Sequence, residues 1–221
     1  MVDVGCGPGH FLGRLRVTGP DVRCLVVDVS AGMLSSIEDA QVRRAVGCAD
    51  ALPLPSGSAD AAVAMHMLYH LPDPNAGLAD LRRVIRPGGW LVASTNDHDA
   101  DGLWQLSVDA GLDRAPISAR WPLDGAARAV RTAGFDDVEE QVFDYELAVP
   151  STQPVLDYLD SRRSGFPDVT DKAWHDVRRT VADTVAARIA WHGAVCRTGR
   201  VGIIAARRLR HGRASRALGG K

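Results

Sequence analysis

The sequence predicts an α/β fold in which helices connect the strands of a doubly wound, mostly parallel sheet. The first half of the chain alternates short runs rich in valine with amphipathic segments, a pattern typical of strands joined by crossover helices. A glycine-rich turn follows the first run directly, as expected where a parallel strand enters a helix. The second half ends in two strand-like segments on either side of a helical insertion, which predicts an antiparallel last strand.

Seven segments have the pattern of strands, and together they define the predicted sheet. The first five are short and mostly apolar, as is expected of strands buried on both faces of a parallel sheet, and the third, VRRAV, is the weakest of them. The last two belong to the second half of the chain. In chain order the segments are Val2–Val4, Cys24–Val29, Val42–Val46, Asp60–Met65, Trp90–Thr95, Val138–Val149 and Arg200–Leu209.

Helices with apolar residues at helical spacing are predicted between the strands. They cover His10–Val17, Ala31–Ala40, Asn75–Ile85 and Leu123–Ala133. The segment from Arg86 to Gly89 ends the third helix, because proline interrupts the helix ladder and glycine permits a left-handed exit. Helical insertions follow the fifth and sixth strands. In the second insertion, at about 151–193, Thr170 caps a helix that Gly193 ends.

The length of 221 residues suits a single domain, 1–221, with an elaboration. Within it we expect a cofactor-binding half at 1–96, a substrate-side half at 97–209 and a basic tail at 210–221. With 46% apolar and 24% charged residues, the composition is that of an ordinary globular protein. No apolar stretch approaches the roughly 20 residues of a membrane span and no signal-like segment opens the chain, so the expected location is the cytoplasm.

Charge and cysteine patterns argue against nucleic-acid binding and against a metal site. A net charge of -1 gives no global field that would attract nucleic acid. The basic tail could touch phosphates, but it has no aromatic residue to stack on bases, so a solvated terminus is the favoured interpretation. The cations of the tail and of the residues just before it are Arg207, Arg208, Arg210, Arg213, Arg216 and Lys221. The cysteines form no CxxC pair and no ligand-like spacing with histidine, so we expect neither disulfides nor a metal.

The most informative segment is the turn after the first strand, where Gly5, Gly7 and Gly9 alternate with other residues. Glycine suits a tight turn from strand to helix and lets a ligand lie against bare main chain. The dinucleotide fingerprint GxGxxG would need a glycine at the position of His10. The spacing GxGxG therefore favours a ligand that needs close approach to the backbone over one that needs a pyrophosphate site.

Asp28 ends the second predicted strand, close to the spacing of about 20 residues from the glycines at which a carboxylate reaches ribose hydroxyls. Alternatively, Asp28 caps the helix that begins near Ala31, but Ser30 is the better-placed cap. The two roles are compatible. The glycine turn and Asp28 together favour a ligand that carries an adenosyl group.

Four segments, in order, resemble the motifs of class I S-adenosylmethionine-dependent methyltransferases. VDVGCGPGH resembles their first motif and VVDVSAGML their second-strand segment. GCADALPLPSGSADAAVAMHMLYHLPDP resembles the segment that contacts adenine and continues past the fourth strand, and IRPGGWLVAS resembles the turn before the fifth strand. The pattern is most similar to enzymes of the ubiquinone and menaquinone biosynthesis type. This resemblance implies a Rossmann-like fold, S-adenosyl-L-methionine as cofactor, and in-line methyl transfer to a small-molecule acceptor.

The resemblance also implies which residues contact the cofactor. Asp3 and the three glycines would surround its methionine part, and Asp28 would bind its ribose. Asp50 would bind the adenine amino group, and Ala51 would offer a backbone N–H to the ring. Met33 would face the adenine or the ribose, although packing alone explains it equally well. The full set is Asp3, Gly5, Cys6, Gly7, Gly9, Asp28, Val29, Met33, Asp50, Ala51 and His66.

The chain departs from the family at its start, because members usually carry helices before the first strand, which Met1 nearly begins here. Either an upstream segment is missing from this chain, or the insertions after the fifth and sixth strands cover the cofactor. We expect those insertions, 97–120 and 151–193, to form the walls of the acceptor site. Trp174 in the second insertion is expected to face the interior.

If the acceptor is a phenol or an alcohol, a histidine with a pKa near 6.5 is the natural general base. The candidates are His66, Tyr69, His70 and His98, of which we favour His66 and then His98 as catalytic residues. His70 matches a histidine that is frequent in the family, and a structural hydrogen-bonding role explains it at least as well.

Two other function classes remain open. A nicotinamide-dependent oxidoreductase would share the strand, the glycine loop and the acid, but the altered glycine spacing argues against it. A protein that kept the fold without methylating, either a cyclase-type enzyme or a ligand-binding module, is favoured by the lack of an unmistakable base. The acceptor, its reacting atom and the oligomeric state are left open by the sequence.

Overall fold

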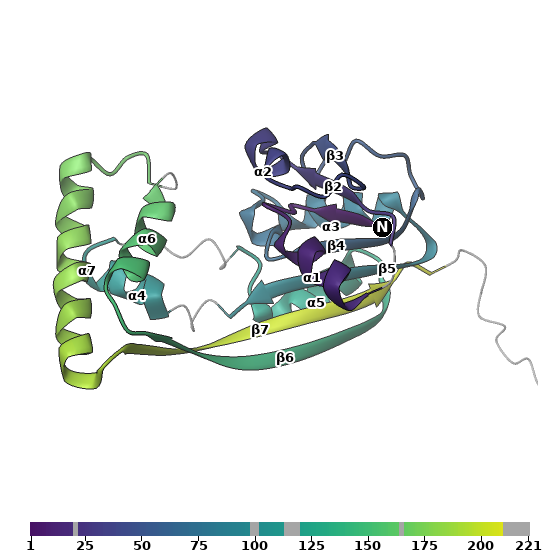
Figure 1. Cartoon of the computed structure of the whole chain (residues 1–221). Coiled ribbons are helices and arrows are strands. Elements are labelled where there is room, and N and C mark those ends of the chain that lie inside the picture. The colour runs from purple at the N-terminus through teal and green to yellow at the C-terminus, as the bar shows by residue number, and fades with distance from the viewer. Residues whose placement is uncertain (20–21, 98–101, 113–119, 164–165, 210–221) are drawn as a thin grey trace, which may run out of the picture. The chain divides into compact units, whose positions relative to one another are not determined.

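The structure is a computed structural model that describes residues 1–19, 22–97, 102–112, 120–163 and 166–209 (Figure 1). Its strands form a seven-stranded sheet in the order β3-β2-β1-β4-β5-β7-β6. The strands are β1 (Val2–Val4), β2 (Leu25–Asp28), β3 (Arg43–Val46), β4 (Ala59–Met65), β5 (Ile85–Asn96), β6 (Asp136–Val149) and β7 (Val195–Arg207). The predicted α/β class and the predicted strand segments are confirmed.

The first five strands are parallel and the sheet becomes antiparallel at β7. β1 pairs in parallel with β2 and β4, β2 with β3, and β4 with β5. β7 runs against β5, because Gly88 bonds to Arg208 near one end of the pair and Asp97 bonds to Arg200 near the other. The predicted antiparallel last strand is therefore confirmed. All of β1 is buried, as expected for a central strand of a sheet covered on both faces.

Helices follow the predicted order along the chain. They are α1 (His10–Thr18), α2 (Ala31–Ser35), the short 3-10 helix η1 (Leu68–His70), α3 (Pro74–Val84), α4 (Gly102–Asp109), α5 (Leu123–Thr132), α6 (Gln153–Ser161) and α7 (Asp171–His192). α1 and α2 bury Leu12 and Leu34 in one cluster with Val26 of β2. The predicted caps of the longest helix are confirmed, since Thr170 accepts from Ala173 and Gly193 ends α7 in the left-handed region.

The described chain divides into two compact units. Unit 1 comprises Met1–Thr95, Arg120–Gln141 and Gly202–Lys221, and unit 2 comprises Asn96–Ala119 and Val142–Val201. Unit 1 holds the parallel strands with α1, α2, α3 and α5, whereas unit 2 holds α4, α6 and α7 around its own apolar core. Trp174 is 5% exposed within that core, as predicted.

α2 is shorter than predicted and ends at Ser35 rather than Ala40. The carbonyl groups at the end of α2 and just after it bond to the side chain of Arg44, instead of to the N–H groups of a further helical turn. The guanidinium of Arg44 donates to the carbonyl oxygens of Leu34 (3.1 Å), Asp39 (3.0 Å) and Ile37. A single arginine fork thus satisfies groups that a longer helix would have satisfied.

β5 begins at Ile85, earlier than the predicted Trp90. Ile85 pairs with Ala59, and the register then shifts before Trp90 pairs with Ala61. The shift lies at the Pro-Gly-Gly segment, where a Cβ on Gly89 would lie 2.6 Å from the Asp60 carbonyl oxygen. The residues predicted to end a helix therefore form a strand with an irregular register.

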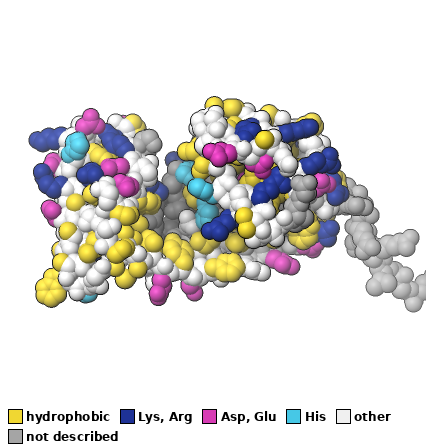
Figure 2. All heavy atoms as spheres, viewed as in Figure 1, with side chains coloured by type: hydrophobic (Ala, Val, Ile, Leu, Met, Phe, Trp, Pro, Cys, Tyr) yellow, Lys and Arg dark blue, Asp and Glu magenta, His cyan; other side chains and the backbone are white. Residues whose placement is uncertain are grey.

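The charged side chains on the surface, the lengths of the helices and the residues before the tail can be compared with the predictions. Lys, Arg, Asp and Glu side chains are scattered over the face shown in Figure 2 rather than gathered by sign. No helix within the described ranges is both long enough and apolar enough to cross a bilayer. Arg207 and Arg208, just before the predicted tail, are described, and their guanidinium groups contact the Trp90 ring and backbone carbonyls respectively. The predicted tail itself, 210–221, lies outside the described residues.

Candidate functional site

The turn after β1 is built from three glycines in the left-handed region, with φ of 65° at Gly5, 53° at Gly7 and 84° at Gly9. A Cβ on Gly5 would lie 2.7 Å from the Cβ of Met67, so this position is closed by packing. A Cβ on Gly7 would meet nothing within 4 Å. Gly7 therefore presents bare main chain to open space, which is the arrangement that close approach of a ligand requires.

Asp28 ties this turn to the end of β2. The Gly7 N–H donates to Oδ2 of Asp28 at 2.9 Å, and the Ser30 N–H donates to Oδ1 at 2.8 Å. The helix cap is Ser30, whose hydroxyl accepts from Met33, so Asp28 is not the side-chain cap of α2. The structure thus brings the carboxylate of Asp28 to the glycine turn.

Asp3 lies beneath the turn with an unsatisfied carboxyl group. It is 1% exposed, and its Oδ2 has no hydrogen-bond partner among the described residues. Burial, and then the charge of Asp28, raises the pKa of Asp3 to about 7. Burial together with the charges of Asp3 and Asp28 also raises the pKa of the Cys6 thiol to about 12, so the thiol stays protonated. Asp3 and Asp28 therefore place two carboxyl groups that repel each other beside the glycine turn.

Apolar side chains lie exposed beyond Asp28. Val29 is 67% exposed, Met33 46% and Val46 59%, and Val46 is the register partner of Asp28. Exposed apolar side chains grouped at a strand end suit the contact with a flat ring. The structure therefore places the predicted contacts Val29 and Met33 on an accessible apolar surface.

Asp50 and Ala51 belong to a tight turn closed by a bridge between Cys48 and Ala51. Gly47 N–H donates to the Asp28 carbonyl oxygen at 3.0 Å, which anchors this segment to the end of β2. Asp50 is exposed and hydrogen-bonds the Cys48 thiol, which raises the pKa of that thiol. The Ala51 N–H donates to the Cys48 carbonyl at 3.2 Å, so the group assigned to a ligand ring already has a partner.

His66 follows β4 in a strained conformation with φ of 54°. Its backbone N–H bonds to Ser94 of β5, at 3.0 Å to the hydroxyl oxygen and 3.2 Å to the carbonyl oxygen. Such strain in a non-glycine residue is kept mostly at functional sites. Burial lowers the pKa of His66, so its imidazole is neutral at physiological pH. Sequence reasoning missed Ser94, whose only signal was a hydroxyl within an apolar strand.

The other base candidates are placed differently. Tyr69 is 7% exposed, and its ring lies 4.8 Å from the ring of His70, which is exposed. His98 lies outside the described residues. Among the described candidates, His66 is the one next to the glycine turn, since its neighbour Met67 packs against Gly5; like His70, it is exposed.

Unit 2 contains a cavity of about 340 Å³ on the strands β6 and β7. The guanidinium Nε of Arg200 donates to Oδ2 of Asp97 at 2.9 Å. Tyr145 covers Gly199, where a Cβ would lie 2.3 Å from the tyrosine ring. The lining residues are Asp144, Tyr145, Glu146, Thr198, Gly199 and Arg200, none of which the sequence singled out.

Comparison with protein families places residues 2–93 in a methyltransferase domain family. A malonyl-[acyl-carrier protein] O-methyltransferase of Hahella chejuensis is 35% identical over 99 residues, covering 43% of this chain and 36% of that protein. A demethylmenaquinone methyltransferase of Mycolicibacterium gilvum is 30% identical over 150 residues, covering 59% of this chain and 66% of that protein. The chain thus spans about a third to two thirds of the length of these relatives.

Among solved structures, a putative methyltransferase of Bacillus halodurans has a similar fold. The TM-score is 0.66 at 16% identity, with 95% of this chain and 92% of that chain covered. The likeness extends through both units, and at this identity it concerns the fold alone.

Proposed function

The chain belongs to the S-adenosylmethionine-dependent methyltransferases, and on this premise we propose that it transfers the methyl group of S-adenosyl-L-methionine to a small-molecule acceptor. The observation that carries the proposal is the pair of hydrogen bonds from Gly7 and Ser30 to the Asp28 carboxylate. Each carboxylate oxygen has a second lone pair, so Asp28 can also accept from the ribose hydroxyls. Gly7 leaves open space beside it.

The charge of the site suits a cationic ligand. Asp3 has a buried carboxyl oxygen without a partner in the described structure, and it lies close enough to Asp28 for the two charges to interact. The positive charge of the ammonium group in the cofactor's methionine part would offset the repulsion between the two carboxyl groups. Asp3, Gly5, Cys6, Gly7 and Gly9 would therefore enclose the methionine part.

The adenosine part would lie along the exposed apolar surface of Val29 and Met33. Asp50 would accept a hydrogen bond from the adenine amino group, since it is exposed on the turn anchored to Asp28. Because the Ala51 N–H already donates to Cys48, the contribution of Ala51 would be its backbone position rather than a free donor.

Bound S-adenosyl-L-methionine supplies a methyl group on a sulfonium, whose positive charge is neutralised during an in-line displacement. The chain's own task is then to orient the acceptor and to exclude water. His66 would take the proton of a hydroxyl acceptor, because burial keeps its imidazole neutral, with an expected contribution of about 10²- to 10⁴-fold. His98 remains the second candidate base.

We also propose which part of the chain binds the cofactor and which part binds the acceptor. We assign the cofactor to unit 1 and the acceptor to side chains of the second half, as predicted for 97–209. The named relatives act on malonyl-[acyl-carrier protein], an acyl group carried on a protein, and on demethylmenaquinone, a free small molecule; the second name supports our proposal of a small-molecule acceptor.

The proposal is tested by calorimetric titration with S-adenosylhomocysteine, followed by transfer of labelled methyl groups to a panel of phenols, alcohols and amines. Asp28→Ala should weaken binding by roughly 1 to 3 kcal/mol, the range for leaving polar groups unpaired. Asp39→Ala is the matched control, because Asp39 is also a hydrogen-bonded carboxylate of unit 1 but pairs with Arg16 at 3.2 Å.

Equal affinity of Asp28→Ala and the unchanged protein would contradict the assignment of Asp28. Tighter binding of a nicotinamide nucleotide than of S-adenosylhomocysteine would overturn the proposal as a whole. Binding without transfer to any acceptor would instead favour a protein that kept the fold without methylating.

A further inference from the structure

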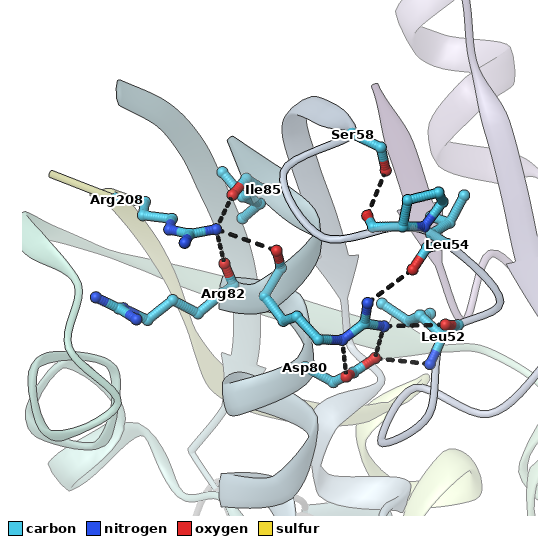
Figure 3. A network of polar contacts seen from close by, with 9 residues as sticks. Leu52, Leu54, Ser58, Asp80, Arg82, Ile85 and Arg208 are labelled. Atoms are coloured by element: carbon cyan, nitrogen blue, oxygen red, sulfur yellow. Dashed lines mark hydrogen bonds and ion pairs between the residues drawn. The ribbon is translucent and has the colours of Figure 1, made fainter. Parts of the chain in front are cut away.

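The segment from Leu52 to Ser58, which follows the turn of Asp50, is held by side chains of α3 (Figure 3). None of its residues belongs to a helix or a strand. Asp80 Oδ2 accepts from the Leu52 N–H at 2.7 Å. The Arg83 guanidinium donates to the carbonyl oxygens of Leu54 at 2.7 Å and Leu52 at 3.0 Å. Two side chains of one helix thus satisfy three backbone groups of the segment.

The two side chains also fix each other. Arg83 donates from Nε to Asp80 Oδ1 at 2.6 Å and from the second guanidinium nitrogen to Oδ2 at 3.0 Å. Burial alone would raise the pKa of Asp80, but the hydrogen bonds from Arg83 and Leu52 outweigh it and the pKa lies below its usual value. This bidentate arrangement needs a planar guanidinium, which lysine cannot replace.

The end of α3 that carries Arg83 is itself held by Arg208, the residue that follows β7. Figure 3 shows Arg208 reaching the carbonyl groups of Arg82 and Ile85. The same guanidinium nitrogen lies 3.0 Å from the carbonyl oxygen of Arg83. A cation at carbonyl groups that the helix leaves unpaired stabilises a helix C-terminus. The Gly57 N–H also donates to the Arg83 carbonyl at 2.9 Å, so the far end of the segment returns to the same residue.

Asp50 therefore lies between two anchors. On one side Gly47 bonds to the Asp28 carbonyl, and on the other Leu52 bonds to Asp80 and Arg83. We propose that Asp80 and Arg83 are positioning residues for the adenine ring, because they fix the turn from which Asp50 would read the amino group. This inference rests on the proposed binding of S-adenosyl-L-methionine.

The test compares S-adenosylhomocysteine with S-inosylhomocysteine by calorimetry on the full chain. The inosyl compound has an oxo group in place of the amino group and a hydrogen on the neighbouring ring nitrogen. The unchanged protein should bind the adenosyl compound about tenfold more tightly, since an oxo group in place of the amino group leaves Asp50 without a donor. Arg83→Lys should reduce that ratio to about threefold or less. Any unfolded fraction of a variant lowers the active concentration for both ligands equally, so it cancels from the ratio.

The matched control is Arg179→Lys, because Arg179 and Asp176 on α7 form an ion pair with the same spacing along the helix at 2.6 Å. The control should keep the ratio of the unchanged protein. If Arg83→Lys does not yield folded protein, Asp80→Asn, which keeps the shape of the side chain, should lower the ratio in the same way.

The outcomes separate this inference from the proposed function. Failure of the unchanged protein to bind either ligand would overturn the proposed function. Binding of both ligands with equal affinity, or a ratio in Arg83→Lys and Asp80→Asn equal to that of Arg179→Lys, would overturn the role of Asp80 and Arg83 and leave cofactor binding intact.

Discussion

The two units differ in which side chains they bury. Unit 1 buries the polar residues Asp3, Ser94 and Thr95 in β1 and β5, whereas unit 2 buries Ser107 as its polar residue among those described. The core of unit 2 is otherwise apolar. Burying polar groups costs stability unless they are hydrogen-bonded. Ser94 and Thr95 are hydrogen-bonded, so the cost in unit 1 falls on Asp3, whose Oδ2 has no partner among the described residues. The difference teaches that unit 1 accepts this cost beside the glycine turn, while packing alone explains the core of unit 2.

The largest expected effect tests whether the two units are energetically separate. Leu159 of α6 is 1% exposed in the core of unit 2, so Leu159→Ala should cost about 2 to 5 kcal/mol of that unit's stability. Affinity for S-adenosylhomocysteine should not change, because the candidate contacts lie in unit 1. Differential scanning calorimetry and titration of the same preparation would check both statements. A parallel loss of affinity would show that unit 2 supports the site.

The second prediction compares two glycines of the same turn. Gly5→Ala should destabilise unit 1 by about 2 kcal/mol or more, because strain at positive φ adds to the contact with Met67. Gly7→Ala carries the strain without a contact, so its cost in stability should be about 1 kcal/mol, but its Cβ would occupy the open space of the ligand. Thermal unfolding and titration should therefore rank the two variants in opposite order. The same rank in both measurements would contradict the open position of Gly7.

Local patterns predicted the elements of unit 1 that depend on backbone geometry. The glycine turn, Asp28 at the end of β2 and the Ser30 cap were readable because each uses residues adjacent in sequence. The early end of α2 was not readable, since it depends on Arg44, which bonds carbonyl groups of residues before it in the chain. The strand across the Pro-Gly-Gly segment depends in the same way on pairing with β4.

The residues of the candidate site were also predictable only where a local sequence pattern marks them. Sequence patterns indicated Asp50 and His66 but not Asp80, Arg83 or Ser94, whose side chains bond to backbone groups distant in sequence. In unit 2, periodicity located α7 and its caps, yet the cavity at Tyr145 and Arg200 arises from two strands far apart in sequence. Pairing of distant segments carries no periodic signal.

The third prediction concerns the pH dependence of unit 1. Asp3 has a pKa of about 7 in the folded chain against 3.8 ordinarily, so the folded state binds its proton more tightly. Stability should therefore be greatest below about pH 4 with respect to this group and should fall between pH 4 and 7, by up to about 1.4 kcal/mol per pH unit. Asp3→Asn should remove this slope in denaturant unfolding measured across that range. A slope that persists in Asp3→Asn would show that another group causes it and would contradict the raised pKa of Asp3.

The smallest expected effect compares exposed apolar side chains of the two units. Val29 in unit 1 is 67% exposed and Trp191 in unit 2 is 85% exposed, so replacing either by serine should change stability by less than about 0.5 kcal/mol. Only Val29→Ser should weaken binding of S-adenosylhomocysteine, by roughly 0.5 to 1 kcal/mol, because the ligand would bury this side chain. Titration of both variants gives the comparison directly. A loss of affinity in Trp191→Ser of the same size would place part of the ligand's contact in unit 2, and equal affinities in both variants would leave Val29 an ordinary surface residue.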